Sequence, residues 1–311
     1  MISQAYICAA GHSGSTLLDL LIGSHSAAES LGEVSHLAKN IALNTKCSCG
    51  EPVRACSFWQ RVIPELERRL NLEIWRRPYS LELGFPKPAV IRDRIHRSVR
   101  YKTARKFFLG LRYAELRYGL PVPSLLLAPV RRGITNNLTL YQTVRDLTGK
   151  QLVVDSSKDY LKGHGIYLTR PESTRIILLS RDGRGVLYSN KKRGFDRAKS
   201  LRGWRNYYSR CLALLRRHVP PEAIVPVKYE ELVQDPAAQL RRICHAVGIP
   251  FEAQMLEFST HTHHITNGND MRFATSSAIR ADLAWQTRLN ADDLALFESI
   301  AGRLNRELGY P

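Results

Sequence analysis

Short apolar runs alternate along the chain with longer segments in which apolar residues recur at helical spacing. We expect the runs to form buried strands at residues 6–10, 152–154, 175–179 and 224–227. The segments between them would form the connecting helices. This alternation predicts a three-layer α/β sandwich, in which helices flank a central parallel sheet.

Three helices carry particularly clear signals. Asp235 is a typical capping residue, Pro236 suits the first helical position, and Gly248 ends the apolar period that follows. Asn290 predicts the start of a second helix, which would close the domain. Residues 201–215 carry apolar side chains at the spacing of a third amphipathic helix.

The region from about residue 59 to 133 is helical in period, rich in Lys and Arg, and interrupted by prolines. Between Lys87 and Arg132 it holds twelve Lys or Arg residues and two acids. Such a run is typical of a solvated helix face. Because nearly all of its charges are positive, it also fits docking of an anionic acceptor. We therefore expect one domain over residues 1–311, with this segment as a basic helical insertion.

Composition and charge narrow the classes of protein and partner. A hydrophobic content of 44% excludes overall disorder. The 46 Lys and Arg residues outnumber the 28 Asp and Glu, and the net charge of +18 indicates an anionic partner without identifying it. The chain has no apolar run of about eighteen residues and no signal-peptide pattern, so we expect a cytoplasmic protein without a membrane span.

Three of the six cysteines, Cys47, Cys49 and Cys56, lie close together in the sequence. Structural zinc normally takes four ligands, so a histidine such as His36 would have to complete a zinc site here. Free thiols, or a local disulfide formed on oxidation, are the simpler interpretation, and we assign no metal ligand.

The first predicted strand runs into the segment AGHSGSTLL at residues 10–18. This segment is similar to a nucleotide-hydrolysing P-loop, but Ser15 stands where that loop has its lysine. A helix is expected to begin near Ser15, and its free backbone N–H groups and dipole would attract an anion. The segment therefore predicts a P-loop-type fold that binds phosphate without magnesium-assisted chemistry; a packed turn of small residues is the alternative.

A second anion site is predicted in the segment RIILLSRDGRGVLYSNKKR at residues 175–193. Arg181 would end a strand, and Ser189 and Arg193 are four apart on the helix expected to follow. Arginine grips phosphate oxygens with two nitrogens, and a serine hydroxyl adds a donor. A basic helix terminus at the surface would explain the arginines but not this spacing.

Together, the two segments resemble the sulfotransferase family that uses 3′-phosphoadenosine 5′-phosphosulfate (PAPS), most closely its bacterial and tyrosylprotein-type branch. Residues 11–18 are similar to the family's 5′-phosphosulfate loop, and Arg181 with Ser189 is similar to its 3′-phosphate motif. The segment VKYEELVQDP at residues 227–236 looks like the family's adenine-contacting segment. The resemblance therefore covers nearly the whole chain apart from the insertion.

The resemblance implies a set of residues that bind PAPS. Arg193 falls where the branch often has a further basic contact, Tyr229 would stack on or bond to the adenine, and a late loop would close over the 3′-phosphate. The implied set is Gly11, His12, Ser13, Gly14, Ser15, Thr16, Leu17, Arg181, Ser189, Arg193, Tyr229, Gly268, Asn269 and Arg272. The migrating sulfuryl group carries less negative charge than a γ-phosphoryl group, so no metal is required.

The resemblance also implies roles in the chemistry. Glu33 would be the base, Lys158 would stabilise the leaving phosphate, and His12 replaces the usual Lys or Arg of the loop. Because a histidine is cationic only when protonated, we expect the affinity for PAPS to fall above neutral pH. His12, His36 and His164 are alternative bases, since imidazole titrates near neutrality.

We therefore expect an enzyme that moves a sulfuryl group from PAPS to an acceptor hydroxyl. The basic insertion favours a carbohydrate or other glycan acceptor, with protein tyrosine or a small phenol or alcohol as alternatives. A P-loop kinase or NTPase is disfavoured by Ser15 and by the Arg181 and Ser189 pair. A non-catalytic polyanion binder remains the alternative that the charge allows, although we expect no nucleic-acid partner; the sequence assigns no oligomeric state.

Overall fold

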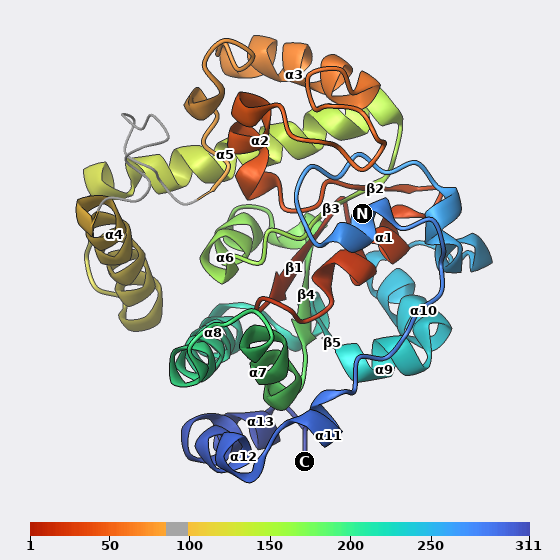
Figure 1. The fold of residues 1–311 in the computed structure, drawn as a ribbon. Helices are drawn as coiled ribbons and strands as arrows, with labels where there is room; N and C mark the ends of the chain where they lie inside the picture. The colour runs from red at the N-terminus through yellow and green to blue at the C-terminus, as the bar shows by residue number, and fades with distance from the viewer. Residues whose placement is uncertain (85–98) are drawn as a thin grey trace.

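The structure, a computed structural model, describes residues 1–84 and 99–311 and has a parallel sheet at its centre (Figure 1). The strand order is β2-β3-β1-β4-β5, and all four neighbouring pairs run parallel. The strands are β1 (Gln4–Ala9), β2 (Ala28–Ser30), β3 (Leu152–Asp155), β4 (Thr174–Ser180) and β5 (Ile224–Lys228). This arrangement confirms the predicted fold class, and β2 is the strand that no apolar run predicted.

Helices cover both faces of the sheet, as predicted. The longer ones are α1 (Ser15–Gly23), α3 (Ser57–Leu70), α4 (Val99–Tyr118), α5 (Ser124–Thr148), α6 (Tyr160–Thr169), α7 (Gly183–Lys191), α8 (Arg197–His218) and α10 (Pro236–Val247). The shorter ones are α2 (Leu37–Leu43), α9 (Tyr229–Gln234), α11 (Trp285–Arg288), α12 (Ala291–Phe297) and α13 (Arg303–Glu307). In Figure 1, α6 and α8 lie on one side of the sheet, and α9 and α10 lie on the other.

The strands are apolar on both faces because each face has its own core. In β1, Tyr6 and Cys8 belong to the core under α3, α5, α6 and α8, whereas Ala5 and Ile7 belong to the core under α1 and α10. Successive side chains of a strand point to opposite faces, so a sheet buried on both sides needs continuous apolar runs. This explains why the apolar runs located four strands correctly.

The three helices with clear sequence signals are present. The Asp235 side chain accepts from the backbone N–H of Ala238, Pro236 takes the first position of α10, and Gly248 follows its end with a φ of 75°. Asn290 caps α12. The predicted helix at 201–215 lies within α8.

The predicted basic insertion contains α3, α4 and the first part of α5. The helix α5 does not stop at residue 133 but continues to Thr148, where it packs against α3 and leads into β3. Residues 85–98, which carry part of the basic run, lie outside the described residues. Over the part of the chain that is described, no helix is both long enough and apolar enough to span a membrane.

Candidate active site

The β1–α1 loop has two residues in a left-handed conformation, His12 with a φ of 64° and Gly14. Gly14 has a φ of 85° and caps α1, whose first residue is Ser15. A Cβ atom at Gly14 would lie 2.5 Å from the Tyr229 ring, so only glycine allows the loop to pack on that ring. The N-terminus of α1, whose first backbone N–H groups have no partner within the helix, begins directly after this glycine.

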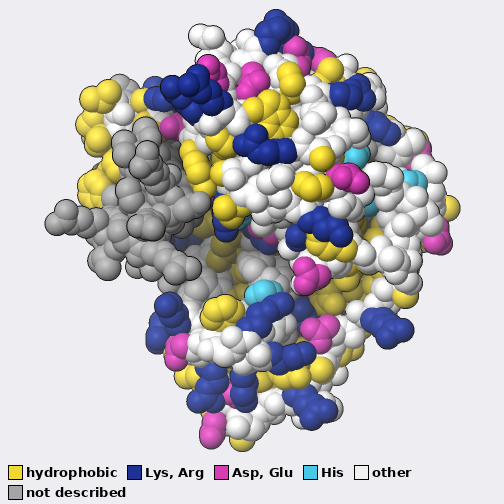
Figure 2. Space-filling view, turned by 45° about the horizontal axis from the view of Figure 1, so that its top comes forward, with side chains coloured by type: hydrophobic (Ala, Val, Ile, Leu, Met, Phe, Trp, Pro, Cys, Tyr) yellow, Lys and Arg dark blue, Asp and Glu magenta, His cyan; other side chains and the backbone are white. Residues whose placement is uncertain are grey.

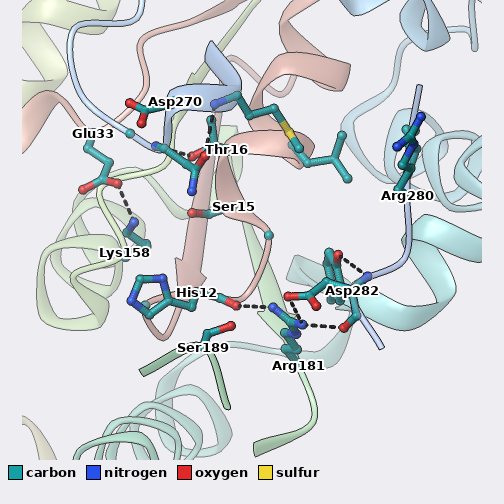
Figure 3. A pocket seen from close by; sticks show the side chains of 18 of the residues that line it. His12, Ser15, Thr16, Glu33, Lys158, Arg181, Ser189, Asp270, Arg280 and Asp282 are labelled. Carbon is teal, nitrogen blue, oxygen red and sulfur yellow. Dashed lines mark hydrogen bonds and ion pairs between the residues drawn. The ribbon is translucent and has the colours of Figure 1, made fainter. Parts of the chain in front are cut away.

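One cavity of about 600 Å³ opens beside this loop, a volume typical of small-molecule sites. It lies at the carboxyl ends of β1, β3 and β4, where the strand order reverses and open α/β sheets bind ligands. Its lining includes Gly11, His12, Gly14, Ser15, Thr16, Leu17, Glu33, Lys158, Arg181, Ser189, Arg193, Tyr229, Gly268 and Asn269. The structure thus brings residues from distant segments of the chain to one cavity (Figure 3).

Arg181 is fixed in the cavity wall by contacts on several sides. Its guanidinium carbon lies 4.5 Å from the centre of the Tyr229 ring, and one nitrogen donates to the backbone oxygen of His12. A second nitrogen contacts both the backbone oxygen and the carboxylate of Asp282, at 2.7 and 3.1 Å. Its Nε is buried and has no hydrogen-bond partner among the described residues. This nitrogen lies against Gly185, where a Cβ atom would be 2.9 Å from it, so the two other nitrogens of the guanidinium make the contacts described above.

Glu33 and Lys158 form an ion pair at the other end of the cavity (Figure 3). The second carboxylate oxygen of Glu33 accepts from the Asn267 side-chain nitrogen at 3.2 Å and lies 3.8 Å from His36 Nε2. Lys158 follows β3 with a φ of 67°, which is rare for a residue with a side chain. Its backbone oxygen accepts from the Tyr207 hydroxyl, which anchors this strained turn. Such strain is typical of functional sites.

His12 contacts the other cationic groups of the cavity. Its ring lies within hydrogen-bond distance of Arg193, with 2.7 Å between His12 Nδ1 and a guanidinium nitrogen. Burial, reinforced by the charges of Arg193, Lys158 and Arg181, lowers the pKa of His12 below its usual value. This shift favours the neutral form of His12 near pH 7 and so argues against the expected fall in affinity for PAPS above neutral pH, which stays a prediction.

Some sequence-predicted residues occupy other places than expected. Arg193 lies beyond the end of α7 rather than on the helical face of Ser189, although both line the cavity. Ser13 does not line it, since its hydroxyl lies 3.3 Å from the buried Tyr208 hydroxyl. Arg272 also lies outside the lining; it donates to the backbone oxygen of Gly268 and so supports the late loop.

Two of the alternative bases, His164 and His36, lie in different places relative to the cavity. His164 lies outside the cavity, with its ring 4.9 Å from that of His218. Burial lowers the pKa of His164 to about 3. His36 contacts Glu33, so it lies beside the candidate base.

Several further lining residues come from the segment before α11 and were not predicted from the sequence. These residues are Asp270, Met271, Ile279, Arg280 and Asp282. They occur in a stretch without helical or strand period, so no pattern marks them. The late loop itself is held to α1, because the backbone N–H of Asn269 donates to the Thr16 hydroxyl at 3.1 Å.

The face that contains the cavity is hollowed in the space-filling view, and Lys and Arg side chains gather below the hollow (Figure 2). Among the lining residues, Lys158, Arg181, Arg193 and Arg280 are positively charged. The three acids of the lining are Glu33, Asp270 and Asp282, and two of these pair with a lining cation. The donors and charges of the cavity are thus suited to an anion with more than one charged group.

Comparison with known proteins agrees with this geometry. Residues 131–253 match the model of the Sulfotransferase family. A Caenorhabditis elegans protein named putative protein-tyrosine sulfotransferase is 28% identical over an alignment of 149 residues that covers 42% of this chain and 57% of that protein. The chain therefore matches somewhat more than half the length of this relative.

Two solved structures share the fold. The sulfotransferase domain of the Synechococcus PCC 7002 olefin synthase has a TM-score of 0.52 and 18% identity, and the match covers 96% of this chain and 95% of that domain. The sulfotransferase domain of the curacin biosynthetic pathway has a TM-score of 0.50 and 16% identity, with 100% and 99% covered. Together with the family match, these findings confirm the resemblance to the sulfotransferase family.

Proposed function

We propose that the protein transfers a sulfuryl group from PAPS to the hydroxyl of an acceptor. The observation that supports this most directly is the single cavity shared by the N-terminus of α1 and by Arg181 with Ser189. Two separated anion sites in one cavity suit a nucleotide with phosphate groups at both its 3′ and 5′ positions.

Each end of the nucleotide would be held by different residues. Backbone N–H groups of the β1–α1 loop and the Thr16 hydroxyl would bind the 5′ end. Arg181 and Ser189, with Arg193 beside them, would bind the 3′-phosphate. The adenine would lie near Tyr229, whose ring is already flanked by Gly14 and Arg181.

The chemistry would take place at the end of the cavity that holds Glu33 and Lys158. When bound, PAPS supplies the sulfuryl group and a phosphate leaving group. Glu33 would accept the proton of the acceptor hydroxyl at its carboxylate, oriented by Asn267. The Lys158 ammonium would stabilise the negative charge that develops on the leaving oxygen. Because side chains and amides supply these charges, the proposed reaction needs no metal.

Two classes of acceptor have separate support. The net charge of +18 favours an anionic glycan, as expected from the sequence. The name of the Caenorhabditis elegans relative favours a protein tyrosine. A screen with labelled sulfate over glycan, phenol and peptide acceptors distinguishes them.

Calorimetry with three nucleotides tests the donor site. We expect adenosine 3′,5′-bisphosphate to bind at least about tenfold more tightly than adenosine 5′-monophosphate or ATP, since only the bisphosphate occupies both anion sites. An Arg181→Gln variant should lose most of this preference for the bisphosphate over the monophosphate, because only Ser189 and Arg193 would remain for the 3′-phosphate. Arg202→Gln, an exposed change on α8, is the matched control and should keep the preference.

Turnover measurements test the catalytic roles. With an identified acceptor, Arg181→Ala should raise the KM for PAPS, whereas Glu33→Gln and Lys158→Ala should mainly lower kcat. A loss of about a hundredfold in kcat is expected for Glu33→Gln, as for removal of a general base. Full turnover of this variant would reject Glu33 as the base.

Magnesium-dependent ATP hydrolysis by the wild-type protein would instead support the P-loop NTPase alternative.

A further inference from the structure

Four metal-binding side chains meet outside the cavity, in a region that the proposed reaction does not use. The sulfur atoms of Cys47, Cys49 and Cys56 and a ring nitrogen of His264 lie within 4.8 Å of one another. Cys56 Sγ is 3.3 Å from His264 Nδ1 and 3.6 Å from Cys49 Sγ. The fourth side chain is therefore His264, which is 208 residues from Cys56, and not His36, which contacts Glu33.

These distances suit a tetrahedral ion. Bonds of about 2.3 Å to sulfur and about 2.0 Å to nitrogen put the corners of a tetrahedron roughly 3.5–3.8 Å apart. Three cysteines and one histidine form one of the usual ligand sets of structural zinc. All four positions would be filled by protein, so the ion would have no open position for a substrate.

The backbone holds each of these side chains in place. Cys47 and Cys49 lie on a tight turn, in which the N–H of Gly50 donates to the Cys47 oxygen and that of Cys47 donates to the Glu51 oxygen. Cys56 is the N-cap residue of α3. The turn and the helix start thus present their sulfur atoms to the same point.

His264 is held by two aromatic residues from the first turn of α3, one at its ring and one at its backbone. The ring stacks on Phe58 with a centroid distance of 4.7 Å and nearly parallel planes. The backbone oxygen of His264 accepts from Trp59 Nε1 at 3.0 Å. Packing thus fixes the orientation of the imidazole, as the residues around the ligands do in metal sites.

We infer that Cys47, Cys49, Cys56 and His264 bind one structural zinc ion. A disulfide would use only two of the three sulfurs and would leave His264 without a role, whereas zinc uses all four groups. Cys47 and Cys56 are fully buried, and Cys49 and His264 are half-buried, so the ion would be shielded from solvent.

The zinc ion would attach the late loop to the start of α3 and thereby support the cavity. Directly after His264, Ile265 packs against Gly32, where a Cβ atom would lie 2.4 Å from the Ile265 side chain. Two residues further on, Asn267 donates to the Glu33 carboxylate. The ion would thus fix the loop that orients Glu33.

Metal analysis of protein purified without a histidine tag tests this inference. We expect one zinc per chain, tightly held through dialysis against a weak chelator. Cys49→Ser and His264→Gln should each lose most of the zinc. Cys244→Ala and His261→Gln change the same residue types outside the cluster and should keep it. His264→Cys should also keep zinc, because four cysteines form an equally good site.

X-ray absorption at the zinc edge makes the test independent of whether the variants fold. The wild-type protein should show three sulfur scatterers and one nitrogen scatterer around zinc. Replacement of zinc by cobalt should produce the visible absorption of a tetrahedral thiolate site. Zinc-free wild-type protein with a Cys49–Cys56 disulfide, or zinc retained in full by Cys49→Ser, would overturn the inference. Neither result depends on sulfotransferase activity, so this test and that of the proposed function fail separately.

Discussion

At the scale of single residues, Asp282 places a carboxylate beside Arg181, where the proposed function requires the phosphate of a ligand. The Asp282 carboxylate contacts Arg181 at 3.1 Å and is about half exposed, whereas the arginine side chain is 6% exposed. Asp282 therefore neutralises the buried arginine and competes with any anion that binds there. Phosphate would have to displace this carboxylate to reach the same nitrogen.

We expect Asp282→Asn to bind adenosine 3′,5′-bisphosphate more tightly than the wild type, by up to about fivefold. This is the effect of removing a partly exposed ion pair worth up to about 1 kcal/mol. Calorimetry measures it, with Asp270→Asn as the control, because Asp270 lines the cavity without a contact to Arg181 among the described residues. Equal tightening in both variants would mean that only the overall charge matters.

The state of His12 leads to a prediction about pH. Because burial and the neighbouring cations lower its pKa, we expect His12 to be mostly neutral and to change its charge little between about pH 7 and 8.5. We measure the dissociation constant of the bisphosphate for the wild type and for His12→Asn over that range. Each constant drifts as other groups titrate, but the ratio of the two should stay constant. A ratio that rises with pH would show that the histidine binds as a cation.

The sequence located residues of the cavity lining where a local motif marks them, and it missed residues that only tertiary contacts bring there. Gly14 lies at a helix start, Arg181 follows a strand end and Ser189 lies within α7, so their positions follow from local pattern. Asp282 and His264 belong to irregular segments, and nothing local predicts that they meet Arg181 and Cys56. The left-handed backbone of Lys158 likewise depends on its surroundings.

At the scale of elements, the apolar runs predicted four strands and the caps predicted α10 and α12. The missed strand β2 is a three-residue edge strand, and its sequence Ala-Glu-Ser has no apolar run to mark it. Arg193 was placed on a helix because the residue spacing continues past Lys191, but α7 ends there and the chain turns at Gly194. Helix ends without a strong stop signal are poorly defined by sequence.

The β1–α1 loop permits a test of the packing between elements. We expect Gly14→Ala to lower the free energy of unfolding by at least about 1–2 kcal/mol, because a left-handed residue with a side chain is strained and its Cβ would meet the Tyr229 ring. Gly11→Ala in the same loop should change it little, since a Cβ atom at Gly11 would meet nothing within 4 Å and its φ is not positive. Urea denaturation compares the two, and equal losses would contradict the packing that we describe.

At the scale of the whole molecule, we propose that the helical segment α3–α5 and the sheet form one domain, because one continuous core joins them. His164 lies inside that core on α6, near His218 and Arg112, and both of its ring nitrogens lack a hydrogen-bond partner among the described residues. Burial in this cationic surrounding lowers its pKa to about 3. The native state therefore keeps His164 neutral, whereas the unfolded chain protonates it below about pH 6.5.

This difference makes global stability depend on pH in a direction that can be worked out. Below the unfolded pKa the unfolded state binds the extra proton, so stability falls with falling pH by about 1.4 kcal/mol per unit until the folded pKa is reached. Between about pH 8 and pH 5, His164 should therefore cost about 2 kcal/mol. Asp19 and Glu29, whose pKa values burial raises to about 7, act in the opposite sense and lower stability as the pH rises.

His164, Asp19 and Glu29 affect stability over overlapping pH ranges. The effect of His164 is therefore isolated by comparing variants at two pH values. In urea denaturation at about pH 8 and pH 5, the wild type should lose about 2 kcal/mol more than His164→Leu, which has no proton to bind at that position. His245→Gln removes an exposed histidine from α10 and should behave like the wild type. If His164→Leu loses as much stability on acidification as the wild type, the imidazole takes up its proton in the folded protein, and the core around α6 must admit water or an anion.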